Sequence, residues 1–100
     1  MYAIKKCSKR DGRIVRFDRN RIQNAISKAF FESNEGNVDI AKKVTESVIE
    51  RIVRSHIETV PNVEQIQDLV EYTLMDLSFT QTAKCYILYR EKRNRDREQD

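Results

Sequence analysis

Apolar residues recur every three or four positions over much of the chain, which predicts helices joined by short connections. Asp18 stands just before the first such stripe, where its carboxylate can cap the helix, and Phe17 and Ile22 fit the two positions of a hydrophobic staple. We therefore expect a first helix to begin immediately after Asp18. Its inward face would comprise Ile22, Ala25, Ile26, Ala29 and Phe30.

Three further helices are predicted downstream. Polar residues at 33–37 break the pattern, and a second helix runs from about 38 to 54. Asn62, with Gln65 three residues later, marks the start of a third helix, and a fourth covers roughly 80–93. The positions expected on the inward faces are Ile40, Ala41, Val44, Val48, Ile52, Val63, Ile66, Val70, Thr73, Leu74, Leu77, Ala83, Tyr86, Ile87 and Arg90.

The start of the chain is typical of a β-hairpin. Residues 3–9 alternate loosely, an Asp-Gly pair at 11–12 is a strong turn signal, and 14–17 is short and β-prone. A two-residue turn would place Arg10 directly opposite Arg13. Like charges facing each other across strands destabilise a hairpin by roughly 0.2–1 kcal/mol. We therefore expect an anion to offset them.

The expected fold class is α+β, a four-helix bundle capped by a small β-hairpin or a three-stranded sheet. A β-branched segment at 56–60, ending at Pro61, either adds the third strand or forms an extended connector. One hundred residues is the size of a single small domain. We place that domain at 1–93 and expect the tail at 94–100, which has no apolar residue, to be disordered or frayed.

Positive charge is concentrated at the front of the chain. The formal net charge is +3, but residues 1–21 hold eight Lys and Arg against two acids, whereas residues 22–89 hold six against ten. This asymmetry predicts an anionic partner for the first segment. The chain has no apolar run of membrane-spanning length, and its N-terminus lacks the apolar core of a signal peptide. We expect a cytoplasmic protein with no membrane partner.

The sequence offers few groups for metal binding or catalysis. Cys7 and Cys85 lie far apart, no CxxC pair occurs, and His56 is the one histidine. In a cytosolic chain a structural disulfide is not expected either, so both cysteines are interpreted as packing residues. A phosphate-binding P-loop, a carboxylate pair and a nucleophilic triad are also missing. We expect no metal and no catalytic activity.

Three cations, Lys9, Arg10 and Arg21, are placed to converge on one anion. The first turn of the first helix carries Arg19 and Arg21, each opposing the helix dipole by roughly 0.3–1 kcal/mol when exposed. A helix start with arginines and amide donors is a candidate phosphate site. Lys9 and Arg10 in the preceding turn are ordinary surface residues when taken singly. Together with Arg21 they favour phosphate binding.

Three motifs together resemble the ATP-cone domain, which occurs at the N-terminus of ribonucleotide reductases and in a bacterial repressor of reductase genes. They are KRDG at 9–12, FD followed by RI at 17–22, and AKCYILYR at 83–90. KRDG alone is a weak signal, but the three at these distances are specific and extend the resemblance over residues 3–93. The last motif is most similar to that of the anaerobic, glycyl-radical reductases. The repressor carries a zinc ribbon ahead of its cone, which this sequence does not.

The resemblance implies a site for ATP or dATP, with magnesium, between the hairpin and the helices. Phosphate contacts would come from the hairpin turn, the first helix and the end of the fourth helix. Small or aliphatic side chains would pack against the nucleotide base. Gln67 and Val63, near the start of the third helix, are weaker candidates, and Val15 stands where some members have Glu. The implied nucleotide-binding residues are Cys7, Lys9, Arg10, Asp18, Arg21, Ile22, Gln67 and Lys92.

These observations predict a regulatory module that binds a nucleotide effector. The bound phosphates would change hairpin order or helix packing and act through self-association or contact with a reductase catalytic domain. Such coupling is typically worth about 1–3 kcal/mol. The alternatives are the effector domain of the repressor and a small nucleic-acid-binding domain. Against the latter, the bases of the tail alternate with acids, and no aromatic platform lies among the N-terminal bases. A third alternative, an enzyme that acts on nucleotides, is the least favoured.

Overall fold

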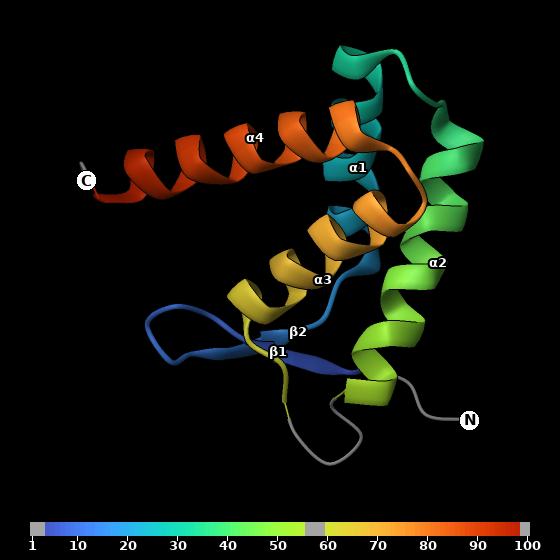
Figure 1. The fold of residues 1–100 in the computed structure, drawn as a ribbon. Coiled ribbons are helices and arrows are strands. Elements are labelled where there is room, and N and C mark those ends of the chain that lie inside the picture. Colours follow the sequence, from blue (N-terminus) through green and yellow to red (C-terminus); the bar gives the residue numbers. More distant parts are fainter. Residues whose placement is uncertain (1–3, 56–59, 99–100) are drawn as a thin grey trace.

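The computed structural model describes residues 4–55 and 60–98, which form a two-stranded sheet and four helices (Figure 1). This confirms the predicted α+β class. Residues 56–59, most of the proposed third strand, lie outside the described residues. Next to them, Ser8 and Asn62 form a single parallel bridge. In chain order the elements are β1 (Lys6–Ser8), β2 (Ile14–Arg16), α1 (Arg19–Ser33), α2 (Val38–Ser55), α3 (Val63–Asp76) and α4 (Thr80–Glu98).

The helices begin where the capping signals predict. The Asp18 carboxylate accepts a hydrogen bond from the backbone N–H of Asn20 at 3.0 Å, which caps α1. Asn62 and Gln65 form a reciprocal capping box at the start of α3, with bonds of 2.8 and 2.9 Å. At its far end, α4 continues to residue 98, beyond the predicted limit at Arg93.

The core lies between four helices that pack in a ring, with α1 and α3 each contacting both α2 and α4. The predicted inward positions are buried or half-buried, with one exception. Leu77 is 45% exposed because α3 ends at Asp76, so the helical repeat no longer directs Leu77 inward. The largest fully buried side chains are Phe30, Ile26, Ile52, Leu74, Val44, Val48 and Val70. The smaller side chains of Thr45, Thr73, Thr82 and Pro61 are also fully buried.

The turn of the hairpin contains residues 10–12 rather than two residues. The Lys9 N–H donates to the Arg13 carbonyl at 2.8 Å, and Gly12 has a φ of 88°. A glycine in this left-handed conformation closes a three-residue hairpin loop. Lys9, and not Arg10, therefore faces Arg13, and the expected Arg10–Arg13 pair is wrong. The anion that offsets Arg13 is Asp11, whose carboxylate lies 2.7 Å from the guanidinium.

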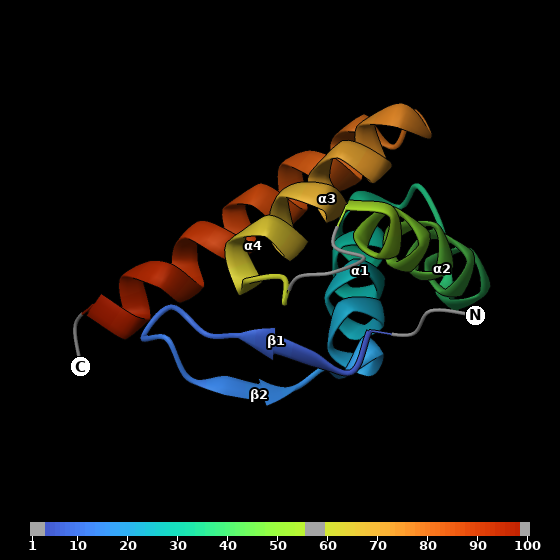
Figure 2. The ribbon, with the colours of Figure 1, turned by 90° about the horizontal axis from the view of Figure 1, so that it is seen from below.

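The hairpin forms a separate layer beside the helices (Figure 2). In both views its turn and the C-terminal end of α4 project to the same side of the molecule (Figures 1 and 2). One backbone bond ties β1 to the segment before α3, from the Ser8 N–H to the Pro61 carbonyl at 3.0 Å. Among the described helices, none has the length and apolar character needed to cross a membrane.

Candidate functional site

The hairpin presents two different faces. Cys7 and Val15 are paired across the strands, and both pack against the core, so their face is turned towards the helices. Ile14, the next residue of β2, is 55% exposed on the opposite face. Because side chains alternate along a strand, Lys9 shares the inner face with Cys7. This predicted ligand is half-buried at the end of β1.

The charges of two predicted phosphate ligands act on the thiol of Cys7. Burial raises the pKa of this thiol, while the positive charges of Lys9 and Arg21 act in the opposite direction. Charges exert such an effect only over short distances. Lys9 from the hairpin and Arg21 from the first turn of α1 therefore both act on the Cys7 thiol, and their convergence on one anion stays a prediction. Ile22 belongs to the same core cluster as Cys7.

These two cations have no acidic counterpart in the part of the chain that the structure describes. Neither Lys9 nor Arg21 forms an ion pair there, and the first turn of α1 carries no acid. The backbone amides of this turn are less available than predicted. Those of Asn20 and Arg21 both bond to Asp18, at 3.0 and 3.2 Å. The site can therefore offer cationic side chains more readily than free N–H groups.

Arg10, the third predicted cation, is engaged with α3. Its Nε lies 3.0 Å from a carboxylate oxygen of Glu64, and both side chains are partly exposed, at 39% and 50%. Glu64 is in the first turn of α3. Glu64 could not be predicted from the sequence, because no local pattern indicates that the start of α3 faces the hairpin turn.

The remaining predicted ligands are more dispersed. Asp18 is exposed and acts as the cap of α1. Gln67 is half-buried on α3, as is Val63, and Lys92 is exposed on α4. Within residues 4–55 and 60–98, no hydrogen bond or ion pair joins Gln67 or Lys92 to Lys9, Arg10 or Arg21. Their participation stays a prediction.

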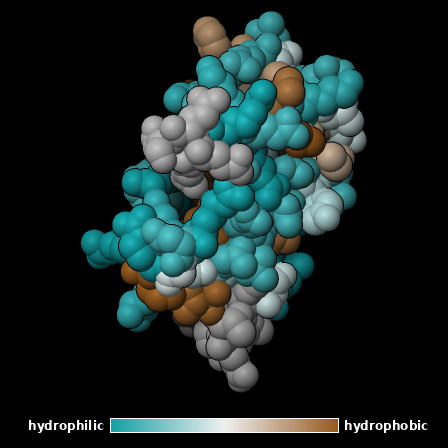
Figure 3. Space-filling view, turned by 90° about the vertical axis from the view of Figure 1, so that its left-hand side faces the viewer, coloured by the Kyte–Doolittle hydropathy of each residue, from teal (hydrophilic) through white to brown (hydrophobic). Residues whose placement is uncertain are grey.

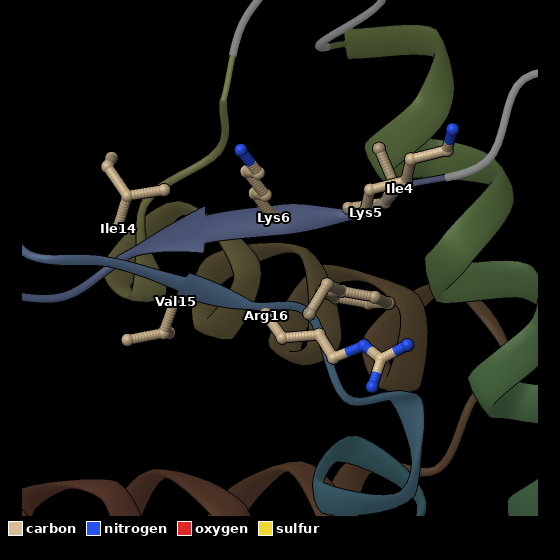
Figure 4. Close-up of a pocket in the computed structure, with 7 residues that line it drawn as sticks. Ile4, Lys5, Lys6, Ile14, Val15 and Arg16 are labelled. Atoms are coloured by element: carbon tan, nitrogen blue, oxygen red, sulfur yellow. The ribbon is translucent and has the colours of Figure 1, made fainter.

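A cleft of about 720 Å³ runs along the two strands, and it is not the predicted site. None of the eight predicted ligands lines it. Lys6 and Arg16 are paired across the strands and exposed, on the face turned away from Cys7. Figure 4 shows six of its seven residues labelled along the strands. The lining consists of Ile4, Lys5, Lys6, Ile14, Val15, Arg16 and Phe17.

The motif at 83–90 joins α4 to α3. Arg90 donates through Nη1 to Asp68 and Glu71, both at 2.8 Å, and through Nη2 to the Glu64 carbonyl at 3.4 Å. Tyr86, one turn earlier, is buried, and this burial raises the pKa of its hydroxyl well above the usual value. Cys85 is half-buried against the core, and both cysteines are free, as predicted. The motif residues Tyr86 and Arg90 therefore serve packing.

The side of the molecule from which the hairpin turn and the end of α4 project is mainly hydrophilic (Figure 3). Hydrophobic atoms form a few separate patches on it. Among the described residues, no group of three or more His, Cys, Asp or Glu side chains is arranged to hold a metal ion.

Comparison with known proteins agrees with the resemblance. The model of the ATP cone domain family matches residues 5–95. The vitamin B12-dependent ribonucleoside-diphosphate reductase of Thermoplasma acidophilum is 42% identical over 96% of this chain and 13% of that protein. The alpha subunit of the Chlamydia pneumoniae ribonucleoside-diphosphate reductase is 35% identical over 89% of the chain and 9% of that subunit. The Haemophilus influenzae anaerobic ribonucleoside-triphosphate reductase is 34% identical over 90% and 13%.

The chain thus spans only 9–13% of the length of these three reductases. The family match, in contrast, covers nearly all of the chain, and it includes the hairpin, the first three helices and α4 up to residue 95. The chain therefore belongs to the ATP-cone domain family, as a regulatory domain.

Proposed function

We propose that this chain binds ATP or dATP as an allosteric effector and transmits the bound state to a ribonucleotide reductase. The observation that carries the proposal is that Lys9, on the inner face of the hairpin, and Arg21, in the first turn of α1, both act on the Cys7 thiol in a member of the ATP-cone family. They come from separate segments and have no carboxylate partner within the described residues. This is the arrangement that a polyphosphate, with its several negative charges, would stabilise.

The chemistry of the pocket divides into two parts. Phosphate oxygens would accept charge-assisted hydrogen bonds from Lys9 and Arg21, which are stronger than bonds between neutral groups. Cys7 and Ile22 supply the apolar edge against which a base can pack. Magnesium would accompany the phosphates, since Mg²⁺ is usually bound through substrate phosphates and few protein ligands. Gln67 and Lys92 complete the proposed ligand set from α3 and α4.

The partner we propose is the catalytic part of a reductase, reached by direct contact or by self-association. Two classes of reductase are candidates for the parent. The motif at 83–90 favours the anaerobic class, which remains our prediction. The 42% identity to the B12-dependent reductase, against 34% to the anaerobic one, favours the alternative. Either class would use the domain in the same way.

Calorimetric titration of the chain with ATP and with dATP, with and without Mg²⁺, tests the proposal. We expect saturable binding of at least one nucleotide, and a melting temperature that rises with nucleotide concentration by mass action. Short DNA and RNA serve as the comparison. If they bind with a steep dependence on salt, while both nucleotides give no heat and leave the melting curve unchanged, the chain is a nucleic-acid-binding domain instead.

A further inference from the structure

Helix α3 presents a row of acids to two arginines from different parts of the fold. Glu64, Asp68 and Glu71 are four and three residues apart, so they lie along one face of the helix. Glu64 pairs with Arg10 of the hairpin turn, while Asp68 and Glu71 pair with Arg90 of α4. One helix face thus connects the hairpin to α4. The Arg10 contact is the part of this row that involves a proposed phosphate ligand.

We propose that Glu64 competes with the effector phosphates for Arg10 and thereby regulates the nucleotide site. In the structure its carboxylate holds Arg10 and keeps the hairpin turn against the start of α3. When a nucleotide binds, Arg10 exchanges the carboxylate of Glu64 for phosphate oxygens, and the hairpin is released from α3. This inference rests on the proposed function.

The position of Glu64 suits such an exchange. Close to it in sequence, the Pro61 carbonyl accepts the Ser8 N–H at 3.0 Å, so the hairpin meets the start of α3 through one backbone bond and one ion pair. The backbone carbonyl of Glu64 also accepts a bond from Arg90 at 3.4 Å. When Arg10 moves away, Glu64 loses its side-chain partner, and the backbone of this same residue contacts Arg90 of α4. This gives the nucleotide a route from the hairpin to the helices.

The strength of the pair also fits a competitor that phosphates can displace. Both side chains are well exposed, and ion pairs of this kind contribute little in water. Removing the carboxylate should therefore increase ATP affinity by about two- to fivefold, the range that such a pair allows. A buried pair would instead have held Arg10 too strongly for an effector to remove it.

The test compares Glu64→Gln with Asp39→Asn, a matched control in the 100-residue chain. Both substitutions remove one acid from the first turn of a helix, but α2 begins at the end of the molecule remote from the hairpin (Figure 1). We expect Glu64→Gln to tighten ATP binding, measured by calorimetry, and Asp39→Asn to leave it unchanged. In the Arg10→Ala background, Glu64→Gln should have no effect, because the contested side chain is gone.

A measurement without nucleotide separates this inference from the proposed function. Hydrogen exchange at the Ser8 amide reports how firmly the hairpin is held to Pro61, and Glu64→Gln should accelerate it several-fold relative to Asp39→Asn. Faster exchange in a chain that binds no nucleotide would support the Arg10–Glu64 contact and refute the proposed function. Unchanged exchange and affinity, or an equal gain of affinity in the Arg10→Ala background, would overturn the competition.

Discussion

The carboxylate of Glu35 caps α4 by binding Thr82 twice. One oxygen accepts the backbone N–H of Thr82 at 2.6 Å and its hydroxyl at 2.7 Å. The Thr82 side chain is buried, and the Ser33 hydroxyl lies 2.7 Å from it. Glu35, in the connection between α1 and α2, thereby supplies a hydrogen-bond acceptor for the first turn of α4, which lies far along the chain. A negative charge at this position also interacts favourably with the helix dipole.

We predict that Glu35→Ala lowers the free energy of unfolding by about 1–2 kcal/mol, because the Thr82 N–H and hydroxyl lose their acceptor. Urea denaturation measures the change. Glu32→Ala, which removes an exposed acid from the end of α1, is the control and should alter stability by no more than about 0.5 kcal/mol. Equal effects of the two substitutions would show that the cap contributes nothing specific.

Gly36 is predicted to be irreplaceable for a steric reason. A Cβ at this position would lie 2.7 Å from Cδ1 of Phe30. The Phe30 ring is fully buried and packs edge-on against Phe79 at 4.9 Å, so it cannot yield easily. Gly36→Ala should therefore lower the free energy of unfolding by about 1–3 kcal/mol in a thermal or urea denaturation.

Gly12 offers a contrast, because a Cβ there would meet no atom within 4 Å, and the constraint is its φ of 88°. Gly12→Asn should be tolerated better than Gly12→Ala, since asparagine adopts the left-handed conformation more readily. No such difference in favour of asparagine is expected at Gly36. If Gly36→Asn were better tolerated than Gly36→Ala, the steric account of Gly36 would be wrong.

Arg90 is expected to matter for the packing of α4 on α3 even without nucleotide. Arg90→Gln leaves Glu71, whose side chain is only 18% exposed, without its ion-pair partner. We expect a loss of about 1–3 kcal/mol in the free energy of unfolding, because a largely buried charge becomes uncompensated. Lys84→Gln removes an exposed cation from the same helix and serves as the control. A loss no larger than that of the control would contradict this role.

Tyr86 predicts a specific sensitivity to alkali. Burial raises the pKa of its hydroxyl in the folded state, so the unfolded chain releases this proton first. The resulting contribution to stability is complete below the unfolded pKa of about 10 and is lost as pH rises above it. Denaturation at increasing pH should show this loss, and Tyr86→Phe should reduce it. An identical pH dependence in the two proteins would exclude Tyr86 as its source.

The helices could be predicted because their signals are local. Asp18 caps α1, Asn62 and Gln65 cap α3, and apolar periodicity identifies the inward residues until a helix ends. Leu77 shows that limit, because it follows the last residue of α3. The hairpin was predicted, but its register was not. An Asp-Gly pair is compatible with loops of two and of three residues. A two-residue type I′ turn would require a positive φ at Asp11 as well as at Gly12, and only Gly12 has one, so the loop is the longer one.

The candidate site was predicted only in part. The hairpin and the capped helix are adjacent in sequence, which predicts that Lys9 and Arg21 share one site, and this stays a prediction. The partner of Arg10 could not be predicted, because Glu64 reaches the hairpin turn only through the packing of α3. Ion pairs between distant segments depend on that packing and leave no periodic or spacing pattern in the sequence.

The central claim is that Lys9 and Arg21 form one anion site around Cys7, and calorimetric titration of three variants with ATP tests it most directly. Lys9→Ala and Arg21→Ala should each weaken binding at least several-fold, on the scale of one charge-assisted hydrogen bond. Arg54→Ala, which removes an exposed cation at the end of α2, should leave it unchanged. Equal affinities for the unaltered chain and all three variants would contradict the claim.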